Sequence, residues 1–296
     1  MRVATYAADS QNPIEHGRTP THSNGENPFD RLVALIESVW DSDVQAIGIS
    51  SAGPLDPHTG VILAPPNIKQ WRNFPLTAKL TKRFGVPAFL DNDANLAALA
   101  EWQFGAGRGH HDVLYLTIST GVGGGVIIGD RLLQGHHGLA AELGHVTLEE
   151  GGSLCGCGGR GHLEAYSSGT GIERFVAEQL GAGRVSALSG AESAKEIADA
   201  ANAGDALARE SYARAGEYLG IGVANFLHSF DPSIVILGGG VTQSGALLWE
   251  PFTASLKRHA FHPRYLEGLV IAKAELGDDA GLLGALTLAR INLRKF

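Results

Sequence analysis

The stretch VLYLTISTGVGGGVIIG, residues 113–129, contains two apolar runs separated by a glycine-rich turn. The runs are short and rich in β-branched residues, which predicts two strands, 113–120 and 123–129, joined across the turn. Such a turn exposes successive backbone N–H groups, and the missing Cβ atoms let a phosphate come close. The turn could equally be a plain glycine-rich hairpin. It is not a Walker A loop, because no Gly-Lys-Ser/Thr follows it at the required spacing.

Strand and helix patterns alternate along the rest of the chain, which is typical of an α/β fold. At 296 residues the chain exceeds one ordinary domain, which predicts two lobes with a change of lobe before residue 113. The other expected strands are 2–7, 44–50, 87–93 and 233–240, with a hairpin turn at 9–12. The expected helices are 28–40, an Ala-rich stretch after residue 93, most of 193–229, and 280–293.

Polar groups and glycines follow two of these expected strands. Asp91, Asn92 and Asp93 close the strand 87–93, where α/β proteins carry ligand residues. One of the two carboxylates would cap the Ala-rich helix, and a positioned carboxylate is also what accepts the hydroxyl proton in phosphoryl transfer. A second glycine turn, LGGGV at 237–241, follows the strand SIVI. Backbone donors at such a strand end suit an anion, and two such turns facing one cleft would form a nucleotide site.

Charge and composition exclude several classes of protein. The net charge of −8 argues against a nucleic-acid-binding face, which would have to be basic. The first twenty residues contain no apolar core of a signal peptide, and no run approaches the ~18 apolar residues of a membrane span. The two cysteines are too close together to bridge, so a cytoplasmic location is expected.

The segment SLCGCGGRGHLEAY, residues 153–166, holds both cysteines of the chain. A disulfide between Cys155 and Cys157 would close a strained ring, and the flanking glycines argue against buried, inert thiols. His145 and His162 complete a set of two sulfurs and two nitrogens, which tetrahedral zinc prefers. Because protein would fill all four positions, this zinc would be structural and not a Lewis acid.

Five segments of the chain together resemble the ROK family of sugar kinases and sugar-responsive repressors, within the actin-like ATPase superfamily. They are LDNDANLAALAEWQFGAGRG (90–109), LTISTGVGGGVI (116–127), AAELGHVTL (140–148), CGCGGRGHLEAYSSG (155–169) and IVILGGGV (234–241).

The resemblance implies an α/β, two-lobed actin-like ATPase (ribonuclease H-like) fold with a central cleft and a zinc-stapled loop. The N-terminal lobe would span 1–108, with the C-terminal helix at about 280–296 packing back on it. The C-terminal lobe would span 109–279 and carry the zinc loop and the nucleotide-binding turns.

The same resemblance implies ATP-dependent phosphorylation of a hexose at its C6 hydroxyl, with glucose the best match. Alternatives are an N-acetylglucosamine or N-acetylmannosamine kinase, and a non-catalytic sugar-binding regulator. A purely structural zinc module would leave Asp93 and the glycine turns unexplained. The implied cofactors are structural Zn²⁺ and Mg²⁺ with ATP. The implied assembly is a homodimer or homotetramer, with no nucleic-acid or membrane partner.

Carried over residue by residue, the resemblance implies Asp93 as the base that deprotonates the sugar's C6 hydroxyl. His145 would use one ring nitrogen for zinc and present the other to the sugar. The positions that match the family's sugar contacts are Gly53, Asn67, Asn92, Glu142, His145 and Glu164. Those that match its nucleotide contacts are Thr120, Gly121, Gly123, Gly238, Gly239 and Gly240.

Two features depart from the family pattern. His162 stands where the family usually has a third cysteine, which is a conservative change of zinc donor. The family also opens with a strand and an Asp-x-Gly-Gly-Thr-Lys phosphate loop, whereas MRVATYAAD resembles the family's second strand. On this resemblance the 296-residue chain is expected to lack one strand and one phosphate-contacting turn, and to be a poor kinase.

Overall fold

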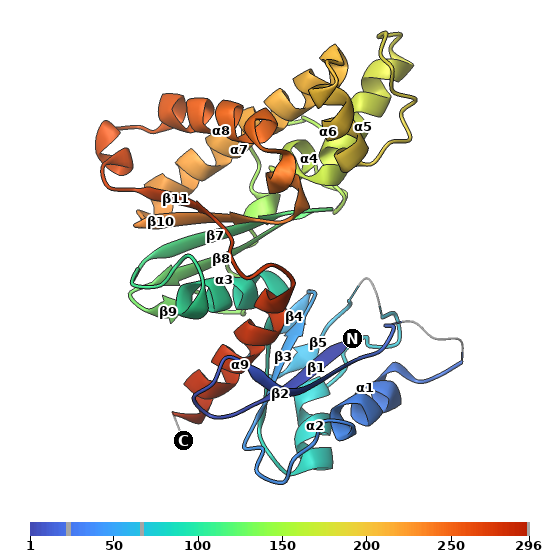
Figure 1. The fold of residues 1–296 in the computed structure, drawn as a ribbon, viewed down its shortest axis with the longest axis vertical. Coiled ribbons are helices and arrows are strands. Elements are labelled where there is room, and N and C mark those ends of the chain that lie inside the picture. The colour runs from blue at the N-terminus through green and yellow to red at the C-terminus, as the bar shows by residue number, and fades with distance from the viewer. Residues whose placement is uncertain (22–24, 66–67, 295–296) are drawn as a thin grey trace. The chain divides into compact units, whose positions relative to one another are not determined.

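The computed structural model describes residues 1–21, 25–65 and 68–294 (Figure 1). The chain divides into two compact units. Unit 1 comprises Met1–Arg108, Leu132–Ala140 and Glu275–Phe296, and unit 2 comprises Gly109–Arg131 and Ala141–Ala274.

The segment 132–140 was expected in the second lobe, but the structure assigns it to unit 1. The side chain of Gln134 donates a hydrogen bond to Asp91 at 2.6 Å. Gly138 lies so close to Pro57 that a Cβ atom at this position would come within 2.2 Å of the proline ring. These contacts hold the segment against unit 1.

Unit 2 is built on a five-stranded sheet of order β11-β10-β7-β8-β9. Strands β7 and β8 pair antiparallel across the glycine turn, which confirms the strand–turn–strand prediction. Strand β10 runs parallel to β7 on one edge and to β11 on the other. The bounds are β7 Val113–Ile118, β8 Val122–Ile128, β9 Arg131–Leu132, β10 Ile234–Gly238 and β11 Val270–Lys273.

The helices of unit 2 follow the apolar and small-residue patterns of the sequence. The longest two, α7 and α8, pack closely because α7 presents Gly216 and Gly220. A Cβ atom at Gly216 would lie 2.7 Å from the carbonyl oxygen of Leu248, and one at Gly220 would lie 2.4 Å from Ser255. The bounds are α4 Glu164–Ser167, α5 Gly169–Gly181, α6 Ala194–Asn202, α7 Ala206–Phe230 and α8 Ala246–His259.

The strands of unit 1 pair two by two. Strands β1 and β2 form an antiparallel hairpin around the expected turn, β3 and β6 pair in parallel, and β4 pairs with β5. The bounds are β1 Arg2–Tyr6, β2 Pro13–Arg18, β3 Ile47–Ser51, β4 Leu55–Asp56, β5 Val61–Ile62 and β6 Ala88–Asn92.

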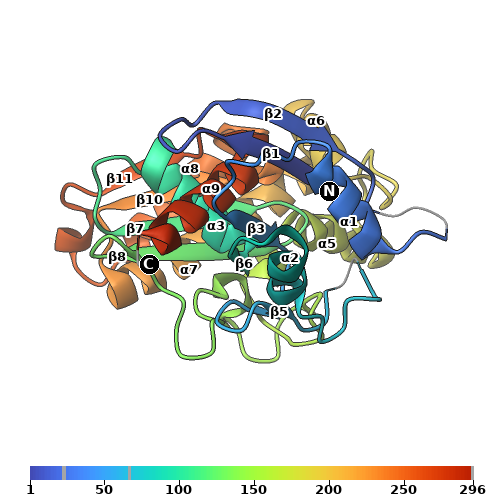
Figure 2. The same cartoon turned by 90° about the horizontal axis from the view of Figure 1, so that it is seen from below.

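In the described residues of unit 1, the helices that cover these strands are α1 Pro28–Glu37, α2 Leu76–Phe84, α3 Asp93–Phe104 and α9 Ala280–Leu293. The last helix packs on α3, β3 and β6 (Figure 2). This contact needs glycines, because a Cβ atom at Gly284 would lie 2.0 Å from the carbonyl oxygen of Leu96 and one at Gly48 would lie 1.9 Å from that of Ala285. Over the described parts of the chain, no helix has the length and apolar character needed to cross a membrane.

Candidate functional site

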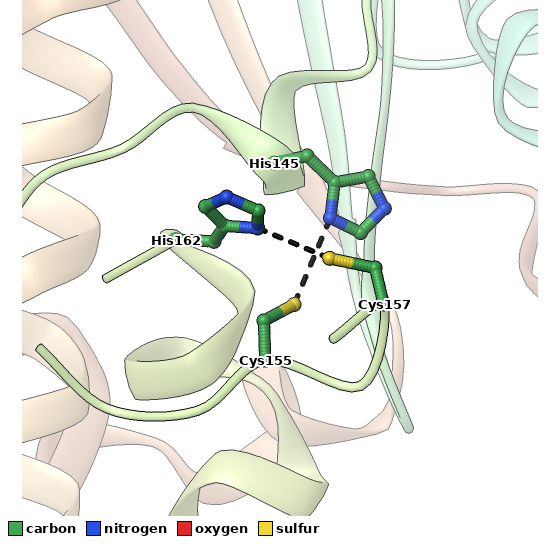
Figure 3. A group of neighbouring side chains, drawn as sticks. All are labelled: His145, Cys155, Cys157 and His162. Carbon is green, nitrogen blue, oxygen red and sulfur yellow. Dashed lines mark hydrogen bonds between the residues drawn. The ribbon is translucent and has the colours of Figure 1, made fainter. Parts of the chain in front are cut away.

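Two cysteines and two histidines of unit 2 come together at one point (Figure 3). The ligand atoms of His145, Cys155, Cys157 and His162 all lie within 4.8 Å of one another. Cys155 Sγ is 3.7 Å from His145 Nδ1, and Cys157 Sγ is 3.2 Å from His162 Nδ1. Tetrahedral zinc holds sulfur and nitrogen ligands ~3.6 Å apart, from its usual bond lengths. The donor set and its spacing therefore fit a structural zinc ion.

The backbone of this metal loop, residues 145–162, turns tightly at glycines. The N–H of Cys155 donates to the carbonyl of Gly159 at 2.8 Å, and the N–H of Gly158 donates to Cys155 at 3.0 Å. Gly161 has a φ of +73°, and a Cβ atom here would lie 1.6 Å from the carbonyl oxygen of Glu149. Only glycine fits this position, which brings His162 back toward the cysteines.

Burial raises the pKa of the Cys155 thiol to about 12, and the neighbouring Glu164 carboxylate acts in the same direction. A thiol in such surroundings needs an adjacent cation in order to ionise. A zinc ion held by this donor set would supply that charge, and the thiol proton would be released on binding.

Two tyrosines and an arginine contact the metal loop and fix its position. Tyr166 stacks on Tyr218 of α7 with ring centroids 3.8 Å apart, and both hydroxyls donate to Glu149 Oε2 at 2.8 Å. The hydrogen bonds from Tyr218 and Tyr166 lower the pKa of Glu149. Arg214 donates to Ser153 Oγ at 3.0 Å. Helix α7 therefore holds both the loop and the start of α4.

Glu164, the first residue of α4, joins the metal loop to the glycine turn between β7 and β8. Its Oε1 lies 3.2 Å from Cys155 Sγ, and its Oε2 accepts a hydrogen bond from the N–H of Val122 at 3.0 Å. A Cβ atom at Gly121 would lie 2.5 Å from Oε2. The glycine is needed so that this carboxylate can reach the turn.

The second glycine turn lies beside the first. Gly239 follows β10 with a φ of +88°, and a Cβ atom there would lie 2.2 Å from the carbonyl oxygen of Ile118, at the end of β7. The structure thus places Gly239 against the end of β7, beside the turn that contains Thr120 and Gly121. Of the other expected residues, Gly238 is the last residue of β10, Gly240 begins the 3-10 helix η2 (Gly240–Ser244), and Gly123 lies within β8. The two glycine-containing turns follow the carboxyl ends of the neighbouring parallel strands β7 and β10. Backbone donors at such strand ends suit an anion.

The start of α5 also lies at this end of the sheet, and the sequence did not predict it. The hydroxyl of Ser168 caps the helix by accepting from the N–H of Gly171. Thr170 donates its hydroxyl to the carbonyl of Thr120 at 2.9 Å, and the N–H of Gly169 donates to Ser119 at 2.8 Å. The capping pattern Ser-Gly-Thr-Gly at 168–171 is the signal that could have found it.

The ELGH segment forms a short 3-10 helix, η1 (Leu143–His145), directly after Glu142. It sits tightly on β8, since a Cβ atom at Gly144 would lie 2.0 Å from the carbonyl oxygen of Val122. Glu142 is exposed, and its carbonyl accepts from the N–H of His145 at 3.0 Å. Val122 therefore contacts η1 through its carbonyl and Glu164 through its N–H.

In unit 1, the end of β6 presents a second group of polar residues. Asn92 is the N-cap of α3 and its Oδ1 accepts from the N–H of Ala94 at 2.9 Å. The sequence had suggested a flanking carboxylate for this position, and Asp93 Oδ1 does accept from the same N–H at 2.9 Å. A Cβ atom at Gly53 would lie 3.3 Å from Asn92 Nδ2. Asn67, the remaining expected sugar residue, lies outside the described residues.

The two carboxylates around Asn92 have different surroundings. Asp91 is fully buried and accepts from the N–H of Asn92 and from the side chains of Asn95 and Gln134. Asp93 is exposed, although nearby protein atoms partly desolvate its carboxylate and raise its pKa. Asp91 therefore organises the strand end, whereas the exposed Asp93 accepts only from the N–H of Ala94 among the hydrogen bonds described.

Comparisons with known proteins agree with this geometry. The model of the ROK family matches residues 3–292. A glucokinase of Streptomyces coelicolor is 35% identical, over 98% of this chain and 94% of its own length. The crystal structure of a ROK hexokinase from Thermus thermophilus superposes with a TM-score of 0.83 at 37% identity, covering 100% of this chain and 96% of that one. A ROK family glucokinase from Streptomyces griseus, in complex with glucose and AMPPNP, gives a TM-score of 0.75 at 37% identity, covering 95% and 93%.

Proposed function

Because the chain belongs to the ROK family and has the family's actin-like ATPase fold, we propose that it is an ATP-dependent hexose kinase. Its substrate is glucose, which it phosphorylates at the C6 hydroxyl to give glucose 6-phosphate. The related glucokinase bound to glucose and AMPPNP supports this choice of substrates.

The observation that carries the proposal is the position of Glu164. One carboxylate oxygen accepts from Val122 at the glycine turn, and the other reaches the metal loop at Cys155. A carboxylate can hold sugar hydroxyls, and the glycine turn can hold phosphate oxygens. Groups suited to the acceptor and to the donor of a phosphoryl transfer therefore lie side by side within unit 2.

We assign the proton transfer to Asp93. Its carboxylate takes the proton of the C6 hydroxyl as the new O6–P bond forms, and the bond between the γ-phosphorus and the β–γ bridging oxygen breaks with both electrons leaving on ADP. The residues assigned to the sugar are Gly53, Asn67, Asn92, Glu142, His145 and Glu164.

The nucleotide is assigned to the two glycine turns of unit 2. Their backbone N–H groups would hold the phosphates, and Mg²⁺ bound to ATP would neutralise part of the phosphate charge. The residues assigned to the nucleotide are Thr120, Gly121, Gly123, Gly238, Gly239 and Gly240.

A coupled assay of ADP release across glucose, mannose, N-acetylglucosamine and N-acetylmannosamine tests the proposal. We expect the highest kcat/KM with glucose and MgATP. A preference for either acetylated sugar would move the substrate to the N-acetylhexosamine class. Sugar binding with no ADP release from any of the four would favour a non-catalytic sugar-binding regulator.

We further propose that the metal loop binds one structural zinc ion per chain. Elemental analysis of purified protein is expected to find about one zinc for each polypeptide, because the four donors lie within 4.8 Å of one another and form a set that tetrahedral zinc prefers. A matched preparation of the His162→Ala variant should contain much less. Purified protein with well under half a zinc per chain would contradict the assignment.

Glu142→Gln and Glu164→Gln are expected to raise the KM for glucose about 10–100-fold with little change in kcat. Each change removes the charge from an acceptor of sugar hydroxyl hydrogen bonds and keeps its shape. Glu150→Gln is the control, since Glu150 is an exposed residue of the same loop. A fall in kcat at unchanged KM in both variants would give these carboxylates a different role.

Two further predictions concern where the protein is located in the cell and how many subunits it contains. A cytoplasmic location and a homodimer or homotetramer remain predictions from the family resemblance. Sedimentation of the purified protein measures the assembly directly.

A further inference from the structure

Helix α3 contains a buried carboxylate to which the proposed reaction gives no role. Glu101 is fully buried, whereas the other buried residues of α3 are apolar, with the exception of Asn95. Among the described residues, no ion pair involves Glu101. Burying a carboxylate is costly unless hydrogen bonds replace the water that it loses. The groups that its two oxygens bind therefore indicate what this side chain does.

The two carboxylate oxygens of Glu101 accept hydrogen bonds from three main-chain N–H groups. Oε2 accepts from Ala106 at 3.0 Å. Oε1 accepts from Glu275 at 2.9 Å and from Leu276 at 2.8 Å. Glu275 lies 174 positions after Glu101 in the chain, although all four residues belong to unit 1. One side chain therefore holds two stretches of backbone that are far apart in the sequence.

Both stretches lie where the chain passes between the two units. Unit 1 ends its first segment at Arg108 and begins its last segment at Glu275. The first passage leads into β7 and the second comes from β11, and β10 lies between these two strands in the sheet of unit 2. We call residues 105–108 and 274–277 the crossing segments. Each of them contains at least one N–H group that Glu101 binds.

The first crossing segment has a shape that receives this carboxylate. A Cβ atom at Gly105 would lie 2.1 Å from Glu101 Oε2, so a larger residue here would displace the carboxylate from Ala106. The main-chain carbonyl of Glu101 also accepts from the N–H groups of Gly105 at 3.0 Å and of Gly107 at 2.9 Å. The side chain and the main chain of Glu101 therefore both determine how the chain leaves α3.

The second crossing segment leads directly into a helix that packs on α3. After Leu276 the chain forms the 3-10 helix η4 (Gly277–Asp279) and then α9, and α9 lies beside α3 in unit 1 (Figure 1). At the other end of this segment, the N–H of Ala274 donates to the carbonyl of Leu237 in β10 at 3.0 Å. The second crossing segment is therefore held to unit 1 by Glu101 and to the unit 2 sheet by β10.

We propose that Glu101 is a positioning residue for the phosphoryl transfer, because it holds both crossing segments to the helix that begins with Asp93. This role rests on the proposed kinase activity, in which Asp93 is the base and the glycine turn after β7 binds phosphate. Glu101 lies eight residues after Asp93, or ~12 Å along the axis of α3. Loosened crossing segments would let the base and the phosphate lose their alignment, and a misplacement of ~1 Å can lower a rate ~10²-fold.

Two variants, Glu101→Gln and Gly105→Ala, test this proposal at different residues. Glu101→Gln keeps the shape of the side chain but places an NH₂ group opposite at least one of the N–H groups, and two donors cannot bond to each other. Gly105→Ala keeps the glutamate and displaces its carboxylate. The control is Leu99→Ala, which opens a cavity at a buried residue of the same helix and leaves the crossing segments unchanged. All are compared with the wild-type protein at a temperature where each is folded by circular dichroism.

Two measurements examine the crossing segments without using enzymatic activity. We expect hydrogen exchange at the three N–H groups that the carboxylate binds to be at least ~10-fold faster in both variants than in the control. Trypsin has an exposed site at each passage between the units, Arg108 and Lys273, and should cleave there faster in both variants than in the control. Exchange and cleavage that match the control in both variants would overturn the proposal.

Steady-state kinetics separate positioning from stability. We expect Glu101→Gln to lower kcat for glucose ~10²-fold with the KM for glucose within about threefold of wild type, since the groups assigned to glucose are unchanged. Leu99→Ala should keep its kcat per folded protein. An unchanged kcat in a Glu101→Gln protein with loosened crossing segments would make Glu101 purely structural and overturn the positioning role. A wild-type protein that phosphorylates no sugar would instead contradict the proposed function, and exchange and cleavage would still decide whether Glu101 holds the crossing segments.

Discussion

Replacing Asp93 with asparagine is expected to lower kcat for glucose phosphorylation by about 10²–10⁴-fold, with the KM for glucose nearly unchanged. The amide keeps the shape and hydrogen-bonding reach of the side chain but cannot accept the C6 hydroxyl proton. Asp93 is exposed at the start of α3, where a substrate can reach it. Steady-state kinetics at saturating MgATP would separate the effect on kcat from that on KM.

Asp30→Asn is the matched control for this variant. Asp30 also lies in the first turn of a unit 1 helix, α1, and is exposed like Asp93. Both substitutions remove one negative charge from a helix N-terminus, so both lose the same interaction with the helix dipole. A kcat that falls equally in both variants, or a loss of sugar binding with unchanged kcat in Asp93→Asn, would assign Asp93 to stability or recognition.

The pH dependence of kcat is an independent test of Asp93 as the base. Partial desolvation raises the pKa of Asp93 above the usual 3.8. Only the deprotonated carboxylate can act as a base, so kcat should rise with pH through this raised pKa and fall as the pH drops below it. The acid limb of the profile should therefore lie above pH 3.8 and should be absent from the residual activity of Asp93→Asn.

The parts of the site that could be predicted from the sequence are formed by residues that lie close together in the chain. His145, Cys155, Cys157 and His162 lie within eighteen positions, and the glycines between them permit tight turns. Their chemistry alone defines a ligand set, and the structure brings them together. The strand–turn–strand at 113–129 was predictable for the same reason, because its apolar runs are local and unambiguous.

The contacts that the sequence did not predict join residues far apart in the chain. Glu164 reaches Val122 across 42 positions, and no spacing rule relates the two. Strand β2 was missed because it is polar and almost wholly exposed, so it has no apolar alternation to detect. The N-cap of α3 is Asn92, whereas the sequence suggested one of the flanking carboxylates. The sequence could not separate them because asparagine and aspartate cap helices about equally well.

The proposed zinc ligands are expected to matter for sugar binding as well as for folding. Cys157→Ser removes one of the four donors, and the apparent free energy of zinc binding in small structural sites is ~10–16 kcal/mol. His162 lies two residues before Glu164, and Cys155 Sγ contacts the carboxylate of Glu164. Loss of zinc would therefore free the loop that fixes Glu164 against the glycine turn.

We expect Cys157→Ser to lose its zinc, to become sensitive to proteolysis between residues 149 and 162, and to raise the KM for glucose by about tenfold or more. His162→Cys is the matched control, since it changes the donor but keeps four ligands. It should retain zinc, resist the protease and keep its KM within about threefold, because either side chain is a good zinc ligand. A metal-free Cys157→Ser protein with a normal KM would show that Glu164 is positioned by Tyr166, Tyr218 and Glu149 alone, since their contacts do not involve the metal.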